Sequence, residues 1–204
     1  MLFSSPPWDS AVYWALDLET GGLEAKKHPI LAVGMVPVRG GTIRLGEAYR
    51  TLVRPETGEG LDPESVRYHQ LVWGEVREAP RLAEVIPEVE RRLREGMLLV
   101  HHASVDLAFL KRAFAGLRLP WPRPRVVDTV DLLVRLASRS LLRNPDAPND
   151  LPNLNLSAAR RAHGLPDYQA HDALTDAVAA AELFLVLRKA LGASTVRRLG
   201  AHKY

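Results

Sequence analysis

Four acidic residues and one histidine lie in three short stretches whose residue types could bind a metal ion. The acids are Asp17, Glu19, Asp106 and Asp176, and the histidine is His171. Carboxylate oxygens are the ligands that hard divalent cations such as Mg²⁺ and Mn²⁺ prefer. Carboxylates that lie close together repel one another unless a cation sits between them. These residues therefore predict a divalent-cation site if the fold brings the three stretches together.

The first two acids follow an apolar segment, residues 12–16, that is rich in β-forming residues. Gly21 and Gly22 end this segment, which is typical of a buried strand that runs into a turn. Side chains two residues apart in a strand point to the same face, so we expect Asp17 and Glu19 to lie side by side. Taken alone, a strand end with two solvated acids explains this stretch equally well.

The third acid, Asp106, follows a second apolar run at residues 97–100. Ser104 is a candidate N-cap, which places Asp106 in the first turn of the next helix. The helix dipole favours an acid in the first turn whatever its function, and for Asp106 alone this explanation is strong. His101 and His102 are expected to be structural or hydrogen-bonding residues, because a site with oxygen ligands has little need of imidazole.

The last stretch opens a long helix with apolar residues at helical spacing from residue 173 onward. Asp172 is a candidate N-cap of this helix, and Asp176 projects from its early turns. His171 precedes the cap, so the helix does not fix its side chain. A histidine beside a divalent cation is a credible general base, because histidine ordinarily has a pKa near neutrality. Without the other stretches, a solvated acid on a helix face is the preferred interpretation of Asp176.

The three stretches together resemble the motifs of the DEDDh family of 3′–5′ exonucleases, to which the proofreading subunit of bacterial DNA polymerase III belongs. The family pattern is Asp-x-Glu, then His-x-Ala-x-x-Asp, then His-x-x-x-x-Asp. Here the motifs begin at Asp17, His101 and His171, and the resemblance covers residues 12–191. Since three motifs stand in the family's order, chance agreement is a poor explanation.

Three positions depart from the family's usual residues. His102 stands where asparagine is common, Val105 where phenylalanine is common, and Gly21 where a second threonine is common. None of the five reactive positions is altered. The departures therefore bear on substrate fit rather than on the chemistry.

The resemblance implies a hydrolase that removes nucleoside 5′-monophosphates from the 3′ end of DNA, single-stranded at that end. Two divalent ions, Mg²⁺ or Mn²⁺, would be held by Asp17, Glu19, Asp106 and Asp176. His171 would remove the proton of the attacking water. A role in DNA repair or proofreading is implied with it.

Three further residues resemble the family's contacts to the terminal nucleotide. Thr20 would bond through its backbone, and Leu23 would wedge against bases. Phe109 is a third candidate, for which core packing is an equal interpretation. Two other functions stay open: an exoribonuclease that trims short RNA, since 2′-OH contacts are not visible in a sequence, and a catalytically silent nucleic-acid-binding module. Loss of a site acid would have favoured the silent module, and none is lost.

The composition is that of an ordinary soluble protein, with 47% hydrophobic and 25% charged residues in a chain of 204. The absence of cysteine excludes a disulfide scaffold and a zinc knuckle. The chain has no apolar stretch of membrane-spanning length and no secretory signal at its start, so we expect a cytoplasmic protein without a membrane partner. The net charge of +3 gives weak support to a nucleic-acid partner.

The order of the expected elements predicts an α/β fold. Strands are expected at residues 11–18, 30–38 and 43–53, a short helix from residue 62, a helix at 80–95, a strand at 97–101, a helix at 104–116, a strand at 125–127, a helix at 129–142 and the long helix after residue 172. The first three strands form an antiparallel meander, and the later alternation of strands and helices implies parallel crossovers. The expected fold is a ribonuclease H-like mixed sheet with helices on both faces, as in the family.

We expect one exonuclease domain at residues 11–195, a flexible segment at 1–10 and a short tail at 196–204. Because the chain ends soon after its last core helix, a free-standing nuclease is favoured over a polymerase subunit. A separately encoded polymerase or a second copy of the chain is left open as a partner. Residues 144–155 are expected to form an exposed loop, whose flanking arginines would give a positive rim or solvated helix faces: Arg139, Arg143, Arg160 and Arg161.

Overall fold

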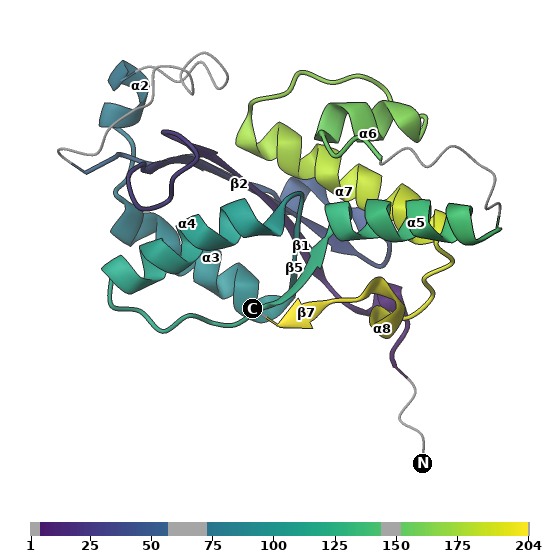
Figure 1. The fold of residues 1–204 in the computed structure, drawn as a ribbon. Helices are drawn as coiled ribbons and strands as arrows, with labels where there is room; N and C mark the ends of the chain where they lie inside the picture. The colour runs from purple at the N-terminus through teal and green to yellow at the C-terminus, as the bar shows by residue number, and fades with distance from the viewer. Residues whose placement is uncertain (1–4, 57–72, 144–151, 204) are drawn as a thin grey trace.

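The computed structural model describes residues 5–56, 73–143 and 152–203. In these residues seven strands form one mixed sheet in the order β3-β2-β1-β5-β6-β7, and β4 also pairs with β2 (Figure 1). The strands are β1 (Tyr13–Thr20), β2 (Ile30–Arg39), β3 (Thr42–Ile43), β4 (Tyr49–Leu52), β5 (Met97–Val100), β6 (Arg125–Asp128) and β7 (His202–Lys203). The helices are α2 (Trp73–Arg77), α3 (Leu82–Glu95), α4 (Ala103–Gly116), α5 (Thr129–Arg143), α6 (Leu156–Ala162), α7 (Ala173–Ala190) and α8 (Val196–Leu199).

The alternation of side chains along β1 divides the core into two halves. Tyr13 and Ala15 point to the face covered by α7, where they pack with Phe184 and its neighbours. Trp14 and Leu16 point to the opposite face and pack with residues of α3 and α4. Because both faces are buried, the strand reads as a continuous apolar run rather than an alternating one. The same alternation directs Asp17 and Glu19 to the α7 face.

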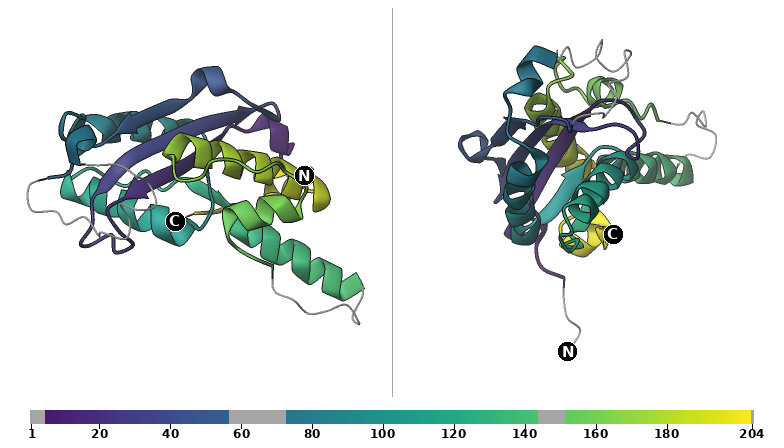
Figure 2. Two further views of the ribbon diagram at one scale, coloured as in Figure 1. Left: turned by 90° about the horizontal axis from the view of Figure 1, so that it is seen from above. Right: turned by 90° about the vertical axis from the view of Figure 1, so that its left-hand side faces the viewer.

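The predicted mixture of strand directions is confirmed. β1 and β2 are antiparallel, whereas β1 and β5, and then β5 and β6, are parallel. Helices lie on both faces: α3 and α4 cover one, and α7 with α5 and α6 covers the other (Figure 1). The far end of α5 projects beyond the sheet (Figure 2). None of the helices in the described ranges combines the length and hydrophobicity that a membrane span requires.

The third predicted strand, residues 43–53, is wrong as one element. It is divided into β3 and β4 by a 3₁₀ turn, η2 (Leu45–Glu47), and both strands pair with β2. Pro37 of β2 accepts a hydrogen bond from the Arg44 backbone N–H, 2.9 Å away, but has no N–H to return. The ladder therefore loses a bond at this point, and the chain leaves the sheet for one turn.

The two ends of the chain are more structured than the sequence analysis predicts. In the segment expected to be flexible, Trp8 belongs to a 3₁₀ turn, η1 (Trp8–Ser10), and its ring centre lies 6.1 Å from that of Phe184. In the segment expected to be a tail, Val196 and Leu199 are buried in α8, and β7 pairs with β6. β7 covers an edge of β6 that would otherwise expose its backbone groups.

Two further points concern short helices. The short helix expected from residue 62 lies outside the described residues. Within the region around the expected 144–155 loop, α6 is an unpredicted helix that begins directly after Asn155, whose side chain accepts a hydrogen bond from the Ala158 N–H at 3.1 Å. This N-cap is an ordinary one, but the seven-residue helix is too short to give a clear hydrophobic period.

Candidate metal centre

The end of β1 places two carboxylates beside the start of α7. In the sheet, Asp17 pairs with Gly34 of β2 and Glu19 pairs with Ala32. A side chain at Gly34 would put its Cβ 2.1 Å from the Ala173 carbonyl carbon, so no residue but glycine lets the first turn of α7 lie this close to the sheet. The close approach brings Asp176 to the carboxylates of β1.

The structure brings together three of the four predicted acids. Ligand oxygens of Asp17, Glu19 and Asp176 all lie within 4.8 Å of one another. Asp176 is 8% exposed, while the two β1 acids are half-buried. As expected, Asp172 caps α7: its carboxylate accepts from the Thr175 N–H at 3.1 Å. A local cap thus fixes the start of the helix, and the helix carries Asp176 four residues further.

The fourth acid, Asp106, reaches the same strand end from the opposite face of the sheet. It is 5% exposed in the first turn of α4, and its carboxylate accepts a backbone hydrogen bond from Leu18 of β1. It lies outside the three-acid cluster but close enough for its charge to raise the pKa of Asp17. All four acids therefore surround the end of β1.

The predicted cap of α4 by Ser104 is wrong. The helix begins at Ala103, and the Asp128 carboxylate at the end of β6 accepts from the backbone N–H groups of His102 and Ala103, at 3.1 and 2.8 Å. The same carboxylate accepts from the Val130 N–H of α5 at 2.9 Å. One side chain therefore caps two helices, because β5 and β6 are parallel neighbours that end together.

Burial and mutual repulsion disfavour ionisation of the clustered acids. Burial raises the pKa of Asp17 well above its ordinary value, and the charges of Asp106, Asp176 and Glu19 raise it further. Burial, followed by the charges of Asp176 and Asp172, raises the pKa of Glu19 to about 7. Burial and the charge of Asp128 raise the pKa of Asp106, against the backbone hydrogen bonds that its carboxylate accepts.

The donor set fits a hard divalent cation. In the described part of the chain, Arg50 forms an ion pair with Asp172 at 2.7 Å, so its charge goes to the helix cap and not to one of the four predicted acids. Carboxylates that are buried close together repel one another, which is costly unless a metal ion compensates their charge. All the ligand atoms are oxygens, which suits Mg²⁺ or Mn²⁺.

The histidines before the two helices differ in what their rings contact. His101 and His102 each bring a ring Nε2 to the Leu154 carbonyl, at 2.7 and 3.1 Å, and since a carbonyl only accepts, each Nε2 carries its proton there. This agrees with the expected hydrogen-bonding role. His171 is exposed with a left-handed backbone (φ 73°), and its N–H donates to Asp176 Oδ2 at 2.8 Å. Its imidazole therefore belongs to a segment that is fastened to a site acid.

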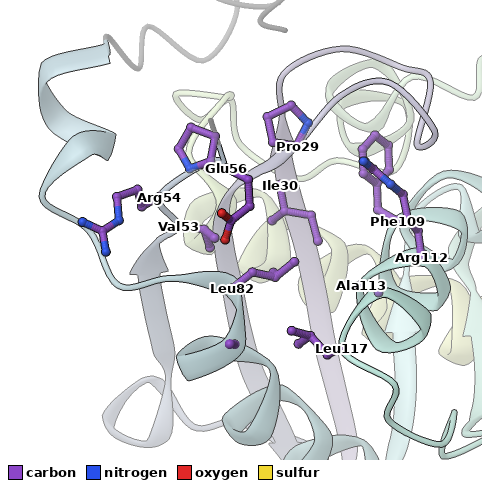
Figure 3. A pocket seen from close by; sticks show the side chains of 13 residues that line it. Pro29, Ile30, Val53, Arg54, Glu56, Leu82, Phe109, Arg112, Ala113 and Leu117 are labelled. Atoms are coloured by element: carbon purple, nitrogen blue, oxygen red, sulfur yellow. The ribbon is translucent and has the colours of Figure 1, made fainter. Parts of the chain in front are cut away.

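The residues predicted to contact the terminal nucleotide differ in their exposure to solvent. Leu23 is 84% exposed in the loop between β1 and β2, whereas the Thr20 hydroxyl donates to the Gly22 carbonyl at 2.8 Å. Phe109 is 2% exposed and packs in the core, on the wall of a hollow of about 320 Å³ between β2, α3 and α4 (Figure 3). The Arg112 guanidinium on this wall donates to the His28 carbonyl at 2.8 Å and so fastens the β1–β2 loop.

Sequence reasoning missed three residues that shape the site: Gly34, Asp128 and Tyr168. The Tyr168 hydroxyl donates to Asp176 Oδ1 at 2.5 Å from an irregular segment between α6 and α7. Arg160 was expected on a positive rim or a solvated helix face, but its side chain is buried. Asp128 alone had a local signal, since an acid directly before a helix is a common cap.

Comparison with known proteins places the sequence among exonucleases. A sequence model of the exonuclease family RNase_T matches residues 14–184. The DNA polymerase III subunit epsilon-like protein of Rhodobacter capsulatus is 30% identical over 196 residues, which are 96% of this chain and 26% of that protein. The PolC-type DNA polymerase III of Thermotoga maritima is 28% identical over 176 residues, which are 86% of this chain and 12% of that protein. The chain thus spans 26% or less of the length of these relatives.

Solved structures agree on the fold. E. coli exonuclease I in complex with a dA16 oligonucleotide has a TM-score of 0.77 at 16% identity, over 93% of this chain and 42% of that one. Its complex with a dT13 oligonucleotide has a TM-score of 0.75 at 16% identity, over 90% and 42% of the two chains. The likeness confirms the predicted ribonuclease H-like architecture.

Proposed function

Because this chain belongs to the RNase_T exonuclease family and carries a 3′–5′ exonuclease domain, we propose that it shortens DNA from a single-stranded 3′ end and releases nucleoside 5′-monophosphates. The observation that carries the proposal is the meeting of Asp17, Glu19 and Asp176 within 4.8 Å, with buried Asp106 beside them. A binding module would have no use for such a costly cluster of acids.

The four acids would hold two divalent ions, Mg²⁺ or Mn²⁺. When bound, such a pair stabilises the charge on the attacking and leaving oxygens of an in-line displacement. The contribution of the protein is to hold its carboxylates in place before substrate arrives, with Asp17 and Glu19 fixed by the sheet. Asp106 and Asp176 are fixed by the first turns of two helices. Rigid elements of this kind keep the reacting groups oriented.

His171 is the proposed general base. Its imidazole would accept the proton of the attacking water, while its backbone N–H stays bonded to Asp176 at 2.8 Å. The exposure of the residue gives the proton a route to solvent after each cleavage. Positioned proton transfer of this type contributes about 10²–10⁴ to a rate.

The loop after β1 is the proposed seat of the terminal nucleotide. Leu23 would press its exposed side chain against a base, which removes apolar surface from water without selecting a sequence. The Thr20 hydroxyl is engaged by Gly22, so we propose that the backbone of Thr20 contacts the substrate. Phe109 would support this region by packing from below, since its ring is buried.

DNA is the proposed substrate because E. coli exonuclease I, whose fold this chain shares, has been solved with DNA oligonucleotides. A relative that trims short RNA would use the same acids, and the 2′-OH decides between the two. We further propose a cytoplasmic protein with a role in DNA repair, acting alone or docked to a polymerase.

The experiment that tests this function offers matched DNA and RNA strands of one sequence to the full chain with Mn²⁺. We expect faster loss of the DNA strand and, by chromatography, nucleoside 5′-monophosphates as the products. Faster loss of the RNA strand would replace the proposal with the exoribonuclease. Intact strands of both kinds, recovered bound to the protein, would replace it with the silent module.

A further inference from the structure

Asp176 is the one acid of the cluster whose two oxygens both accept hydrogen bonds from the segment that precedes its helix. The Tyr168 hydroxyl donates to Oδ1 at 2.5 Å, and the His171 N–H donates to Oδ2 at 2.8 Å. Hydrogen bonds to a charged oxygen are the stronger kind, and two donors on one carboxylate fix its plane as well as its position. Asp176 therefore does not reach the cluster as a freely rotating side chain.

The phenol that holds Oδ1 is itself held from behind by α6. The Arg160 guanidinium lies over the Tyr168 ring, 4.8 Å from its centre, and Ser157 contributes a side-chain hydrogen bond to the same phenol. These two residues are three apart in α6 and so share one face of that helix. The ring is thus fixed from one side by α6 and from the other by Asp176.

Arg160 is buried although it carries a charge: only 2% of its side chain is exposed. Its Nη1 donates to the Ala179 carbonyl at 2.9 Å and to Glu182 Oε2 at 2.6 Å, and its Nη2 donates to the Pro166 carbonyl at 3.2 Å. Burying a guanidinium is expensive, and these bonds tie α6, α7 and the intervening segment into one unit. The buried charge therefore supports the ring that Tyr168 presents to Asp176.

We propose that Tyr168, supported by Arg160, is a positioning residue for the metal centre: it orients the Asp176 carboxylate toward Asp17 and Glu19. The inference rests on the proposed function, because it assigns Asp176 as a metal ligand. It also links ligand and base, since the chain between Tyr168 and His171 is attached to Asp176 at both ends. A tyrosine that only packed would need no hydrogen bond to a ligand.

The test compares two variants that each lose one phenol hydroxyl from a structured tyrosine. Tyr168→Phe removes the bond to Asp176. Tyr13→Phe removes a bond of similar length, 2.7 Å, from a buried tyrosine to the Trp8 carbonyl, in the core rather than at the acids. Titration calorimetry with Mn²⁺ alone measures metal affinity, and kcat and KM are measured on a single-stranded DNA oligonucleotide.

For Tyr168→Phe we expect Mn²⁺ affinity about tenfold weaker than in the native protein, as is typical when the hydrogen-bond partner of a metal ligand is removed. We expect kcat to fall with it, while KM for the oligonucleotide stays unchanged. Tyr13→Phe should match the native protein in all three quantities. Equal Mn²⁺ affinity in the two variants would overturn the positioning role and leave the proposed function standing.

A third variant tests whether Arg160 supports Tyr168. Arg160→Lys keeps the charge but loses the planar stack on Tyr168 and the forked bonds, so we expect weaker Mn²⁺ binding in the same direction as Tyr168→Phe. Unchanged Mn²⁺ affinity in Arg160→Lys would overturn the supporting role of Arg160. Absence of Mn²⁺ binding by the native protein is a separate result, because it would overturn the proposed metal centre itself.

Discussion

The starts of α4 and α7 do the same task in different ways. Each helix carries an acid in its first turn to the end of β1, and each is preceded by a histidine with a left-handed backbone, His102 (φ 72°) and His171 (φ 73°). α7 is capped by the residue before it, Asp172, whereas α4 is capped by Asp128 from another strand. One half of the site is thus fixed locally and the other by the sheet.

The difference distinguishes the histidine that we propose to be reactive from one that supports the fold. The ring of His102 is held against the Leu154 carbonyl, which makes this histidine part of the scaffold. The His171 backbone N–H donates to Asp176 at 2.8 Å, and we propose the ring of this exposed residue as the group that takes the proton. Under the proposed function, the α7 start would supply a general base as well as a metal ligand, and the α4 start would supply a ligand and rigidity.

The largest expected effect distinguishes the two histidines. His171→Ala should lower kcat by about 10²–10⁴, the usual contribution of a general base, while Mn²⁺ affinity persists. His102→Ala, at the corresponding place before α4, should lower kcat far less, because its ring contacts a backbone carbonyl. Steady-state kinetics and Mn²⁺ calorimetry on both variants check this. Equal losses of kcat in the two variants would show that His171 is not the general base.

The next effect concerns the two caps. Asp128→Ala leaves three backbone N–H groups without their acceptor and should lower the free energy of unfolding by about 2–4 kcal/mol. Asp172→Ala loses one backbone bond and the exposed ion pair with Arg50, but it also relieves repulsion with Asp17, so a loss of about 1 kcal/mol or less is expected. Urea denaturation in chelator measures both. A larger loss for Asp172→Ala would contradict the assignment of α4 to a distant cap.

A smaller effect tests how α7 reaches the sheet. In Gly34→Ala, the new Cβ would overlap the backbone of Ala173, so we expect a loss of about 1–3 kcal/mol from overpacking and weaker Mn²⁺ binding as Asp176 moves away. Gly116→Ala at the end of α4 is the control, because nothing lies within 4 Å of its Cβ. If both variants bound Mn²⁺ like the native protein, the close approach of α7 would not be needed.

The smallest expected effect concerns charge at the α4 start. Asp106→Asn removes one like charge, so the metal-free variant should melt at least as high as the metal-free native protein, and its gain from saturating Mn²⁺ should be smaller. If Asp106 served only the helix dipole, its replacement by Asn would instead lower the stability of the metal-free protein slightly. Scanning calorimetry with and without Mn²⁺ decides. An equal Mn²⁺ gain in both proteins would exclude Asp106 as a ligand.

The raised pKa values predict how stability depends on pH without metal. Because the pKa values of Asp17, Asp106 and Glu19 are raised in the folded protein, the folded state takes up protons at a higher pH than the unfolded chain. The resulting stability is present at low pH and is lost as pH rises through the folded pKa, about 7 for Glu19. The melting temperature in chelator should therefore be higher at pH 6 than at pH 8. A higher value at pH 8 would contradict the repulsion.

How far the sequence predicts this site follows from the same comparison. The Asp172 cap was predictable because capping residue and helix are adjacent in the chain, and the pairing of Asp17 with Glu19 followed from the period of a strand. The Asp128 cap joins residues 25 and 26 apart, so the sequence favours the neighbouring Ser104 instead. Tyr168 comes from an irregular segment with no period, and β7 pairs over only two residues. A local signal marks Asp128 only as a cap of α5, and the tertiary contacts to α4 and Asp176 leave none.

We propose that the acids of β1, α4 and α7 together make one metal-dependent centre that cleaves at 3′ ends. The most direct measurement follows single-stranded DNA labelled at its 5′ end, with a circular strand as control, in Mn²⁺ or in chelator, for the native protein and Asp17→Ala. We expect a ladder of labelled strands shortening stepwise from the 3′ end with Mn²⁺, an intact circle, and no cleavage in chelator or by Asp17→Ala. Cleavage of the circle, or full activity in chelator, would contradict it.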